Sequence, residues 1–445
     1  MMKFAGKNFL VIGLARTGGE CARFLARRGA RVWVSDLRPA EDLKREIEKL
    51  AGLDVRYRLG GEDADGLDGI DGVVPSPGVP RENALLRQAA ARNVPVLSEI
   101  ELAYRFFGAP LAAITGTNGK STTTTLIGKM IQASGQKVFV GGNLGTPFIG
   151  AAGADWDWGV IEVSSFQLEW IDQFRPRIAV LLNVSEDHLD RYADFGEYRA
   201  VKQRIFERQS GADTAILNRE DRLVWAAREQ IKARIVSFGF AEVPAGVFAR
   251  DNEIVWRDGA EEERFPLERS QLQGVHNLEN MMAAVAAAKC AGVSRGPIHQ
   301  TLESFPGLEH RLEFVREKDG VRYYNDSKGT NVGAVVKSLA SFSAPVILLA
   351  GGVDKGGDYA PLAGGIKQKV RRLVLFGAAR EVIARALGSF TETVLVDDLQ
   401  SAVRDAAAQA RSGDVVLLSP ACSSFDQFRN YAERGKVFKT LVEQL

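Results

Sequence analysis

The stretch PLAAITGTNGKSTTTTLIGKMIQA, residues 110–133, decides the fold of the middle of this chain. Its apolar start, residues 110–115, predicts a buried strand, and residues 120–133 predict a helix. The glycine-containing turn between them, residues 116–121, directs backbone N–H groups and a helix amino terminus toward one point. Such a point suits phosphate oxygens, so the stretch predicts a phosphate-binding loop.

Within the loop, Lys120 is expected to contact the β- and γ-phosphates of a nucleotide, and the Ser121 hydroxyl to bind Mg²⁺. The glycines let the backbone approach the ligand closely. The spacing G-x-x-G-K-S is two residues shorter than the common phosphate-loop pattern. A glycine turn with an incidental lysine is the other interpretation; the order of strand, loop and helix favours ATP binding. The predicted loop contacts are Gly116, Thr117, Asn118, Gly119, Lys120, Ser121 and Thr122.

A second glycine turn, GLARTG at residues 13–18, lies nearer the amino terminus. It follows a predicted strand, precedes a helix expected over residues 21–28, and is followed by a strand that ends at Asp36. The pattern resembles a dinucleotide fingerprint, but Ala15 stands where a second glycine usually allows close pyrophosphate approach. This departure weakens an NAD interpretation. A UDP group, or a turn with no ligand, remains open.

Acidic residues and one histidine follow two predicted strands of the middle block. Glu162 ends the strand at residues 159–163, and His188 lies within DHLD after the strand at residues 178–184. The carboxyl ends of parallel strands face the crevice where ligands of α/β proteins bind. With Ser121, these groups predict an oxygen-rich Mg²⁺ site with one imidazole. Taken singly, Glu162 also fits a solvated strand end, and His188 a capping or packed histidine.

Lys202 lies in a helix predicted over residues 195–208, between the apolar Val201 and Ile205. A single lysine on a helix is ordinarily solvated, with its stem along the surface. The residues around it do not distinguish it from such a lysine.

The chain of 445 residues is long enough for about three domains. Apolar runs alternate with helical patterns almost throughout, which predicts an α/β protein with parallel sheets. Two hairpins are expected, one within residues 245–268 that turns at Asp251 and Asn252, and one that turns at Asp319 and Gly320. The domain boundaries are expected near residues 98 and 307, which divides the chain into 1–98, 99–307 and 308–445.

Charge and cysteine content exclude several classes of protein. The 57 basic and 56 acidic residues nearly cancel, so no overall field attracts nucleic acid or an anionic membrane. Cys21, Cys290 and Cys422 are odd in number and far apart, which favours unpaired, packed thiols in a reducing compartment. No apolar run approaches the ~20 residues that span a bilayer. We expect a cytoplasmic protein without a membrane span, and a monomer.

Eight motifs, taken together and in order, resemble the Mur ligases over essentially the whole chain. They are GTNGKST (116–122), IEVSSFQLE (161–169), NVSEDHLDRY (183–192), YRAVK (198–202), GVHNLEN (274–280), LEHR (308–311), NDSKGTNV (325–332) and SPACSSFDQF (419–428). The resemblance implies a Rossmann-like amino-terminal domain for a UDP substrate, a central ATPase-like phosphate-loop domain with a mostly parallel sheet, and a Rossmann-like carboxyl-terminal domain for an amino acid. SSFQLE, NDSKGTN and SPACSSFDQF are most similar to the branch that joins D-glutamate to UDP-N-acetylmuramoyl-L-alanine.

The same resemblance implies roles for individual residues. Lys120, His188 and Lys202 would be catalytic, and Lys202 would be carbamylated. Two Mg²⁺ ions would be held by Ser121, Glu162, His188 and Lys202. The remaining ATP contacts would be Asn277, Asn280, Arg311, Asp326 and Lys328. The UDP substrate would contact Arg16, Thr17, Asp36, Arg38, Ser76 and Asn143. D-Glutamate would contact Thr330, Lys355, Ser424 and Phe425. Arg16 replaces the family's apolar neighbour of the uridine and Phe425 its usual leucine, which puts substrate packing at both positions in doubt. For His310, turn packing and a direct role both stay open.

Three other interpretations remain at this stage. A sister ligase that adds another amino acid, or a folylpolyglutamate synthase, shares this style of phosphate loop. The amino-terminal UDP-like block argues against the folate enzyme. An NAD-dependent oxidoreductase would use residues 13–36 but leaves Lys120, Glu162 and Lys328 without a role. A nucleotide-binding regulator without catalysis predicts no release of phosphate from ATP.

Overall fold

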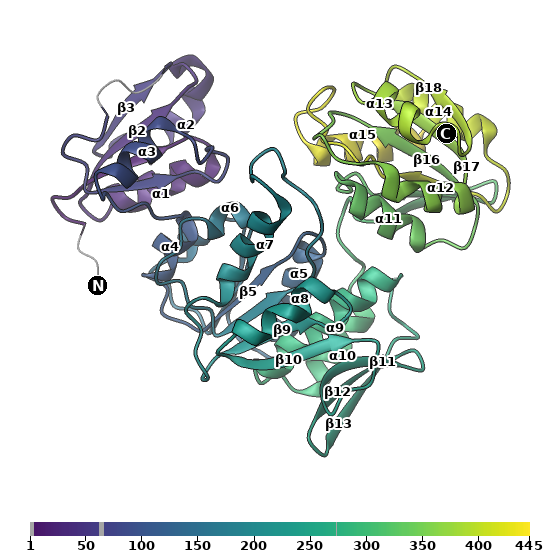
Figure 1. Cartoon of the computed structure of the whole chain (residues 1–445), viewed down its shortest axis with the longest axis horizontal. Coiled ribbons are helices and arrows are strands. Elements are labelled where there is room, and N and C mark those ends of the chain that lie inside the picture. Colours follow the sequence, from purple (N-terminus) through teal and green to yellow (C-terminus); the bar gives the residue numbers. More distant parts are fainter. Residues whose placement is uncertain (1–3, 62–65, 273) are drawn as a thin grey trace. The chain divides into compact units, whose positions relative to one another are not determined.

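Three β-sheets with helices packed on them make up the part of the chain that the computed structural model describes, residues 4–61, 66–272 and 274–445 (Figure 1). The residues fall into two compact units. The first unit comprises residues 1–184, 196–266 and 281–301, and the second comprises residues 185–195, 267–280 and 302–445. The predicted α/β class with mostly parallel sheets is confirmed.

The amino-terminal sheet, in the first unit, has four parallel strands in the order β3-β2-β1-β4. Helix α1 begins at Arg16, before the predicted start at residue 21. The pattern was misleading because Gly18 and Gly19 are poor helix formers. In the fold, Gly18 is needed for packing, since a Cβ there would lie 1.9 Å from the carbonyl oxygen of Gly13. Strand β3, which the sequence analysis missed, alternates apolar and charged residues. The elements are β1 (Asn8–Ile12), α1 (Arg16–Ala26), β2 (Arg31–Asp36), η1 (Ala40–Leu43), α2 (Lys44–Glu48), β3 (Val55–Leu59), β4 (Gly72–Pro75) and α3 (Ala84–Ala91).

The central sheet, also in the first unit, has nine strands in the order β13-β12-β11-β10-β9-β8-β5-β7-β6. The strands from β6 to β11 are parallel and β11 to β13 are antiparallel. The elements before β9 are α4 (Glu99–Tyr104), β5 (Leu111–Thr115), α5 (Lys120–Ala133), β6 (Val138–Gly142), η2 (Phe148–Ala151), β7 (Trp158–Glu162), α6 (Ser165–Leu168), β8 (Ile178–Leu181), α7 (Phe195–Gln203) and η3 (Arg204–Phe206). Those from β9 on are β9 (Thr214–Asn218), α8 (Arg222–Ala226), η4 (Ala227–Gln230), β10 (Arg234–Gly239), β11 (Ala245–Arg250), β12 (Glu253–Asp258), β13 (Glu261–Pro266), α9 (Val275–Cys290) and α10 (Arg295–Ser304).

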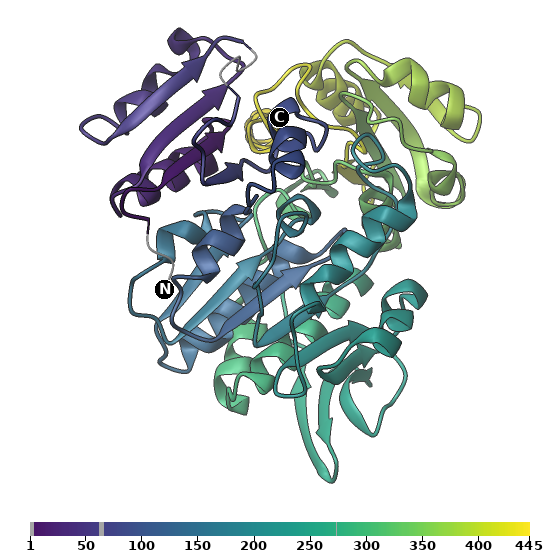
Figure 2. The ribbon, with the colours of Figure 1, turned by 60° about the vertical axis from the view of Figure 1, so that its left-hand side comes forward.

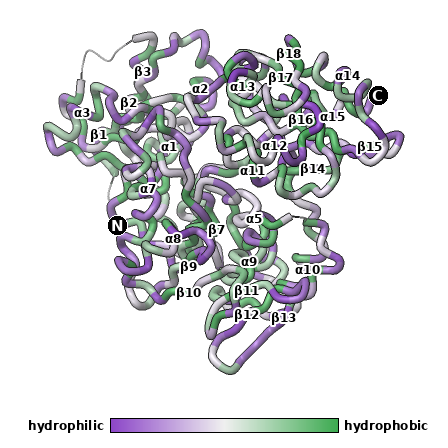
Figure 3. The backbone as a smooth tube through the Cα atoms, turned by 45° about the vertical axis from the view of Figure 1, so that its right-hand side comes forward, coloured by the Kyte–Doolittle hydropathy of each residue, from purple (hydrophilic) through white to green (hydrophobic). Residues whose placement is uncertain are grey.

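The predicted hairpin turn of the central sheet is confirmed, because Asp251 and Asn252 both have positive φ, at 49° and 61°. Two-residue hairpin turns need that backbone conformation. The prediction missed a second turn at Gly259 that adds β13, and it also missed β9, β10 and α10. Figure 2 shows the hairpin of β12 and β13 extending from the sheet, and Figure 3 shows the mostly hydrophilic residues of β13.

The carboxyl-terminal sheet, in the second unit, has six strands in the order β14-β15-β19-β16-β17-β18. Only β14 is antiparallel to its neighbour, across the predicted turn at Asp319 and Gly320, which both have positive φ. Buried apolar residues cover both faces of the sheet. The elements are β14 (Glu313–Lys318), β15 (Val321–Asn325), α11 (Val332–Ala340), β16 (Val346–Gly351), η5 (Ala360–Leu362), α12 (Ala363–Lys369), β17 (Val370–Phe376), α13 (Arg380–Leu387), β18 (Glu392–Leu395), α14 (Leu399–Gln409), β19 (Val415–Leu418) and α15 (Tyr431–Glu443).

Two further expectations concern thiols and membranes. All three cysteines are free, and Cys21 and Cys422 are buried, as expected for packed thiols. Across the described ranges, no helix is both long enough and apolar enough to cross a bilayer.

Candidate active site

Each sheet has a point where its strand order reverses, and loops at the carboxyl ends of the strands there form a crevice. In the amino-terminal sheet the reversal lies between β1 and β4, and in the carboxyl-terminal sheet between β16 and β19. In the central sheet β5 lies between β7 and β8. Some of the predicted site residues follow these strands, and the others follow neighbouring strands or lie on helices.

The predicted phosphate loop connects β5 to α5. Gly116 and Gly119 have φ of 152° and 87°, and a Cβ on Gly116 would come within 3.0 Å of the Cβ of Leu182. Both positions therefore require glycine. Asn183, after β8, holds the loop from the other side. Its carbonyl accepts from the N–H of Thr117 at 2.9 Å, and its side-chain oxygen from the N–H of Asn118 at 2.8 Å. The sequence analysis missed this role of Asn183.

Lys120 begins α5, and its side chain folds back over the phosphate loop. Its Nζ donates to the carbonyls of Gly116, at 2.8 Å, and Thr117, at 2.9 Å. The ammonium group thus lies against the loop whose glycine backbone and helix amino terminus favour an anion. Contact between Lys120 and phosphate oxygens stays a prediction.

Ser121, Glu162 and Asn143 come together beside the phosphate loop, because they follow the neighbouring strands β5, β7 and β6. Ser121 Oγ donates to Glu162 Oε2 at 2.5 Å, and Asn143 Nδ2 donates to Glu162 Oε1 at 2.7 Å. Ser121 is fully buried and Glu162 is 3% exposed. A carboxylate and a hydroxyl are oxygen ligands of the kind that Mg²⁺ prefers, so Ser121 and Glu162 suit two of the ligand positions around a magnesium ion. No group of three His, Cys, Asp or Glu side chains suited to a metal was found in the part that the structure describes.

Lys202, on α7, is buried beside the same loop, so the general expectation of a solvated lysine is wrong for this residue. It is 2% exposed, and its Nζ donates to the carbonyl of Gly116 at 3.0 Å. The Nζ also lies 4.6 Å from the centre of the Tyr198 ring, whose hydroxyl is 3.2 Å from Thr117 Oγ1. An ammonium group here repels a divalent cation, whereas a carbamate carries the negative charge that such a cation needs. The burial of Tyr198 and its contact with Thr117 were missed from the sequence.

His188 belongs to the second unit, unlike Ser121, Glu162 and Lys202. Its backbone has a positive φ of 57°, which is uncommon outside glycine. Its Nε2 lies 3.7 Å from Asp187 Oδ2, and the same carboxylate oxygen accepts from Asn331 Nδ2 at 3.1 Å. The imidazole is one-third exposed and so can meet a ligand.

At the amino-terminal reversal point, Asp36 and Ser76 shape the glycine turn. Asp36 accepts from the N–H of Leu14 at 2.7 Å and from Arg38 Nη2 at 2.8 Å. Burial raises the pKa of Asp36, but these hydrogen bonds and the Arg38 charge outweigh it and lower the pKa to about 2. Ser76 Oγ donates to the carbonyl of Gly13 at 2.7 Å. Arg16 and Thr17 begin α1, with Arg16 exposed.

The nucleotide residues predicted in the second unit lie on α9 and after β15. Asn277 and Asn280 are buried and adjacent on α9, with their side-chain amides 3.5 Å apart. Asp326 accepts from the hydroxyls of Ser338 and Ser419, each at 2.7 Å, and burial raises its pKa to about 6. Lys328 Nζ lies 5.2 Å from the centre of the Tyr431 ring, and Arg311 lies in the loop before β14, half-buried.

For His310 the structure favours packing. The side chain is 5% exposed, and its Nδ1 lies 2.9 Å from the side-chain nitrogen of Asn325. A Cβ on Gly435 would come within 2.2 Å of the imidazole. Burial lowers the pKa of His310, which favours the neutral ring.

The predicted D-glutamate residues follow β15, β16 and β19. The loops after β16 and β19 pair through Val353 and Ser423, with two backbone hydrogen bonds of 2.9 and 3.1 Å. Lys355 and Thr330 are half-buried, Ser424 is buried and Phe425 is 73% exposed. The sequence analysis missed Arg434 on α15, which is fully buried. Its guanidinium donates to carbonyls that include those of Ser327 and Cys422 at 2.9 and 3.2 Å, and so ties these loops together.

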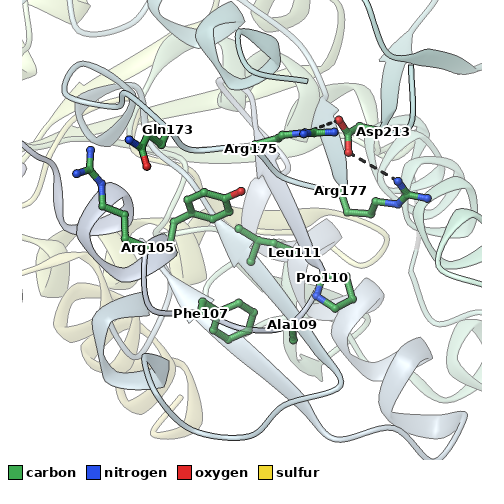
Figure 4. A pocket seen from close by; sticks show the side chains of 10 residues that line it. Arg105, Phe107, Ala109, Pro110, Leu111, Gln173, Arg175, Arg177 and Asp213 are labelled. Atoms are coloured by element: carbon green, nitrogen blue, oxygen red, sulfur yellow. Dashed lines mark hydrogen bonds and ion pairs between the residues drawn. The ribbon is translucent and has the colours of Figure 1, made fainter. Parts of the chain in front are cut away.

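A cavity of about 830 Å³ opens at the other, amino-terminal end of the central strands (Figure 4). Tyr104, Phe107 and Leu111 form part of its lining. Two of its arginines, Arg175 and Arg177, share Asp213 at 2.8 and 3.8 Å. None of the predicted site residues lines this cavity, and its guanidinium groups already have carboxylate partners, so we do not assign the reaction to it.

Three family models match successive parts of the chain. The Mur ligase MurD-like N-terminal domain matches residues 7–98, the Mur ligase middle domain residues 114–288, and the Mur ligase glutamate ligase domain residues 310–422. This chain belongs to the Mur ligase family.

Curated relatives match this Mur ligase over its full length. It is 52% identical to the UDP-N-acetylmuramoylalanine–D-glutamate ligase of Geotalea uraniireducens and 51% identical to that of Geobacter metallireducens. Each match covers 100% of this chain and 99% of the relative. A pseudomurein peptide ligase type C from Methanothermus fervidus has the same fold, with a TM-score of 0.63 at 18% identity, over 99% of this chain and 100% of that one. The chain is thus an ATP-dependent ligase, which excludes the oxidoreductase and the non-catalytic regulator.

Proposed function

We propose that this Mur ligase joins D-glutamate to the L-alanyl carboxylate of UDP-N-acetylmuramoyl-L-alanine while ATP is converted to ADP and phosphate. The reaction is a step of peptidoglycan precursor synthesis. The observation that carries the proposal is the 52% identity, over the whole chain, to a ligase with this donor and acceptor in its name. The reaction belongs in the cytoplasm, where ATP and nucleotide-linked precursors occur, and we propose that the enzyme acts as a monomer.

The chemistry requires activation of a carboxylate. A carboxylate is a poor electrophile, because attack adds charge to an anion. Transfer of the γ-phosphoryl group of ATP to the L-alanyl carboxylate forms an acyl phosphate and releases ADP. The D-glutamate amine then attacks the acyl carbon, and the tetrahedral intermediate collapses to the amide and phosphate. The amine loses its proton to a general base in this step.

In this proposal the phosphate loop stabilises the negative charge of the transferring phosphoryl group. Backbone N–H groups of the loop and the Lys120 ammonium face the transferring phosphoryl group, where fixed positive groups contribute most to catalysis. Ser121 and Glu162 would hold Mg²⁺, which neutralises phosphate charge when bound. We propose a second ion held by His188 and carbamylated Lys202. Carbamylation requires the neutral form of the Lys202 amine.

We place the three domains at residues 1–98, 99–307 and 308–445. Each substrate is assigned to one group of residues. The glycine turn of the first domain, with Asp36, Arg38 and Ser76, would hold the diphosphate and uridine. ATP would occupy the phosphate loop together with Asn277, Asn280, Arg311, Asp326 and Lys328. D-Glutamate would occupy the reversal point between β16 and β19, near Thr330, Lys355, Ser424 and Phe425.

Phosphate release tests the proposal directly. The purified protein is supplied with ATP, Mg²⁺, UDP-N-acetylmuramoyl-L-alanine and a panel of amino acids that includes D-glutamate, L-glutamate and L-lysine. We expect release with D-glutamate and a new amide product by mass spectrometry. Release without D-glutamate, or equal release with L-lysine, would contradict the assignment. UDP-N-acetylmuramic acid without alanine serves as the control acceptor and should give no product.

A further inference from the structure

Two carboxylates are buried on the short helix α4, which precedes the central sheet. Glu99 is 1% exposed and Glu101 is fully buried. Burying a carboxylate is costly unless charge and hydrogen bonds compensate it. The two residues meet this requirement in different ways, and the difference points to a role for Glu99.

Glu101 has a complete set of partners. It accepts from the N–H groups of Asp172, Gln173 and Phe174 at 2.9 to 3.1 Å, and from the Nε of Arg105 at 2.7 Å. The guanidinium neutralises its charge, and the three N–H groups belong to one loop. Glu101 therefore has the environment of a residue that holds a loop and stabilises the fold.

Glu99 lacks a cationic partner. Its Oε1 accepts from the N–H of Ile149 at 2.6 Å, and its Oε2 accepts from Gln167 Nε2 at 3.4 Å. No Lys, Arg or His of the described ranges forms an ion pair with it. Burial raises its pKa to about 7. Burial of a carboxylate without a cationic partner costs stability.

The two partners of Glu99 lie next to predicted site residues. Ile149 belongs to η2, at the end of the loop that begins with Asn143. Gln167 forms a capping box with Ser164, which comes two residues after Glu162. Asn143 is itself bound to Glu162 twice, by its side chain at 2.7 Å and by its backbone N–H at 2.9 Å. Glu99 thus hydrogen-bonds to two segments, the one that follows Asn143 in the chain and the one that follows Glu162.

We propose that Glu99 is a positioning residue that holds the Asn143 loop and Glu162 in the arrangement that binds the UDP acceptor and Mg²⁺. The proposal rests on the proposed function, which assigns Asn143 to the acceptor and Glu162 to the metal. Glu99 touches neither ligand. Its carboxylate accepts from the Ile149 N–H of one segment and from Gln167 Nε2 of the other, with a different oxygen facing each donor.

A glutamine at position 99 tests this role. In Glu99→Gln the side chain keeps its shape, but one oxygen becomes an NH₂ group that faces a donor. An unmet buried donor costs enough to expect a rise of about tenfold in KM for the acceptor and in the Mg²⁺ concentration for half-maximal rate. KM for D-glutamate should stay within about twofold. Assays at pH 8.5 keep Glu99 ionised in the unaltered enzyme.

Glu101→Gln is the matched control, since it changes an equally buried carboxylate on the same helix. It should lower the thermal midpoint and leave both KM values and the Mg²⁺ requirement unchanged. The same KM values in Glu99→Gln and in the unaltered enzyme would overturn the proposal, as would equal rises in both variants.

A second variant keeps the test decisive if Glu99→Gln does not fold. Glu99→Asp retains the charge and withdraws the oxygens by one methylene, so we expect a smaller rise in the same two quantities. An active Glu99→Asp enzyme with unaltered acceptor KM and Mg²⁺ dependence would refute the positioning role. Failure of the proposed function itself would appear differently, as no D-glutamate-dependent phosphate release by the unaltered enzyme.

Discussion

The two glycine turns, residues 13–18 and 116–121, use the same backbone arrangement for different purposes. Each follows the strand at which the order of its sheet reverses, and each leads directly into a helix. Both need glycine at positive φ, at Gly13 and Gly116. They differ in where their charged and polar side chains lie. Beside the first turn Asp36 and Ser76 are buried but Arg16 and Arg38 are exposed, whereas Ser121, Glu162 and Lys202 at the second are all buried.

Under the proposed function this difference separates binding from reaction. The first turn would hold a diphosphate and a uridine, which exposed side chains and one Asp36–Arg38 pair can do. The second would stabilise charge that moves during phosphoryl transfer, and fixed groups away from water do this more strongly. Changes at the second turn should therefore lower kcat, and changes at the first should raise KM.

The largest effect is expected for Lys120→Ala. Removal of the ammonium that faces the transferring phosphoryl group should lower kcat by about 10³-fold, the size seen for the loss of one fixed group that stabilises a transition state. Phosphate release under saturating substrates measures it. Lys129→Ala changes an exposed lysine on the same helix and should retain full activity. Equal rates for both variants would remove the catalytic role of the loop lysine.

Lys202→Ala should come next, with kcat lower by about 10²-fold because one negatively charged ligand of the proposed second metal would be lost. Short carboxylates such as acetate or formate should restore part of the rate, since they can supply the missing charge in the space left by the side chain. Lys120→Ala should show no such rescue. An unaltered rate in Lys202→Ala would refute the carbamate.

Asp36→Asn tests the first turn. It should raise KM for the UDP acceptor by about tenfold, the effect of one lost charge-assisted hydrogen bond, with kcat nearly unchanged. Steady-state rates at varied acceptor concentrations measure both. A fall in kcat at saturating acceptor would contradict the division between the two turns.

The same variant has a consequence for pH. The folded pKa of Asp36, about 2, is below the unfolded value of about 3.9, so ionised Asp36 stabilises the fold above pH 4, and this stabilisation is lost as the pH falls toward 2. The stability difference between the unaltered enzyme and Asp36→Asn should accordingly shrink between pH 5 and pH 2, as urea unfolding followed by circular dichroism can show. A difference that grew in acid would contradict the direction of the pKa shift.

The smallest effect is expected for Ser76→Ala. It removes one neutral hydrogen bond to the carbonyl of Gly13, so KM for the acceptor should rise about threefold to fivefold at constant kcat. A larger effect than that of Asp36→Asn would show that the shape of the turn matters more than its charge.

The local sequence pattern was sufficient to predict the positions of both glycine turns and to place Asp36 and Glu162 at the ends of strands. Each depends on a strand, the residue at its end and the helix that follows, all of which lie within a few tens of residues. The same patterns failed where tertiary packing overrides propensity. Gly18 and Gly19 obscured the start of α1, and the alternating residues of β3 were not recognised as a strand of the parallel sheet.

What the sequence by itself determined is therefore the sheet type, the glycine loop between β5 and α5 and, through its motifs, the resemblance to the Mur ligases. Only the tertiary structure decided that Lys202 is buried, that Asn183 holds the phosphate loop, and that Glu99 connects two site segments without a cation. The physical reason is distance along the chain. Lys202 and Gly116 are 86 residues apart, and Glu99 and Gln167 are 68 apart, so their burial depends on how separate strands and helices pack.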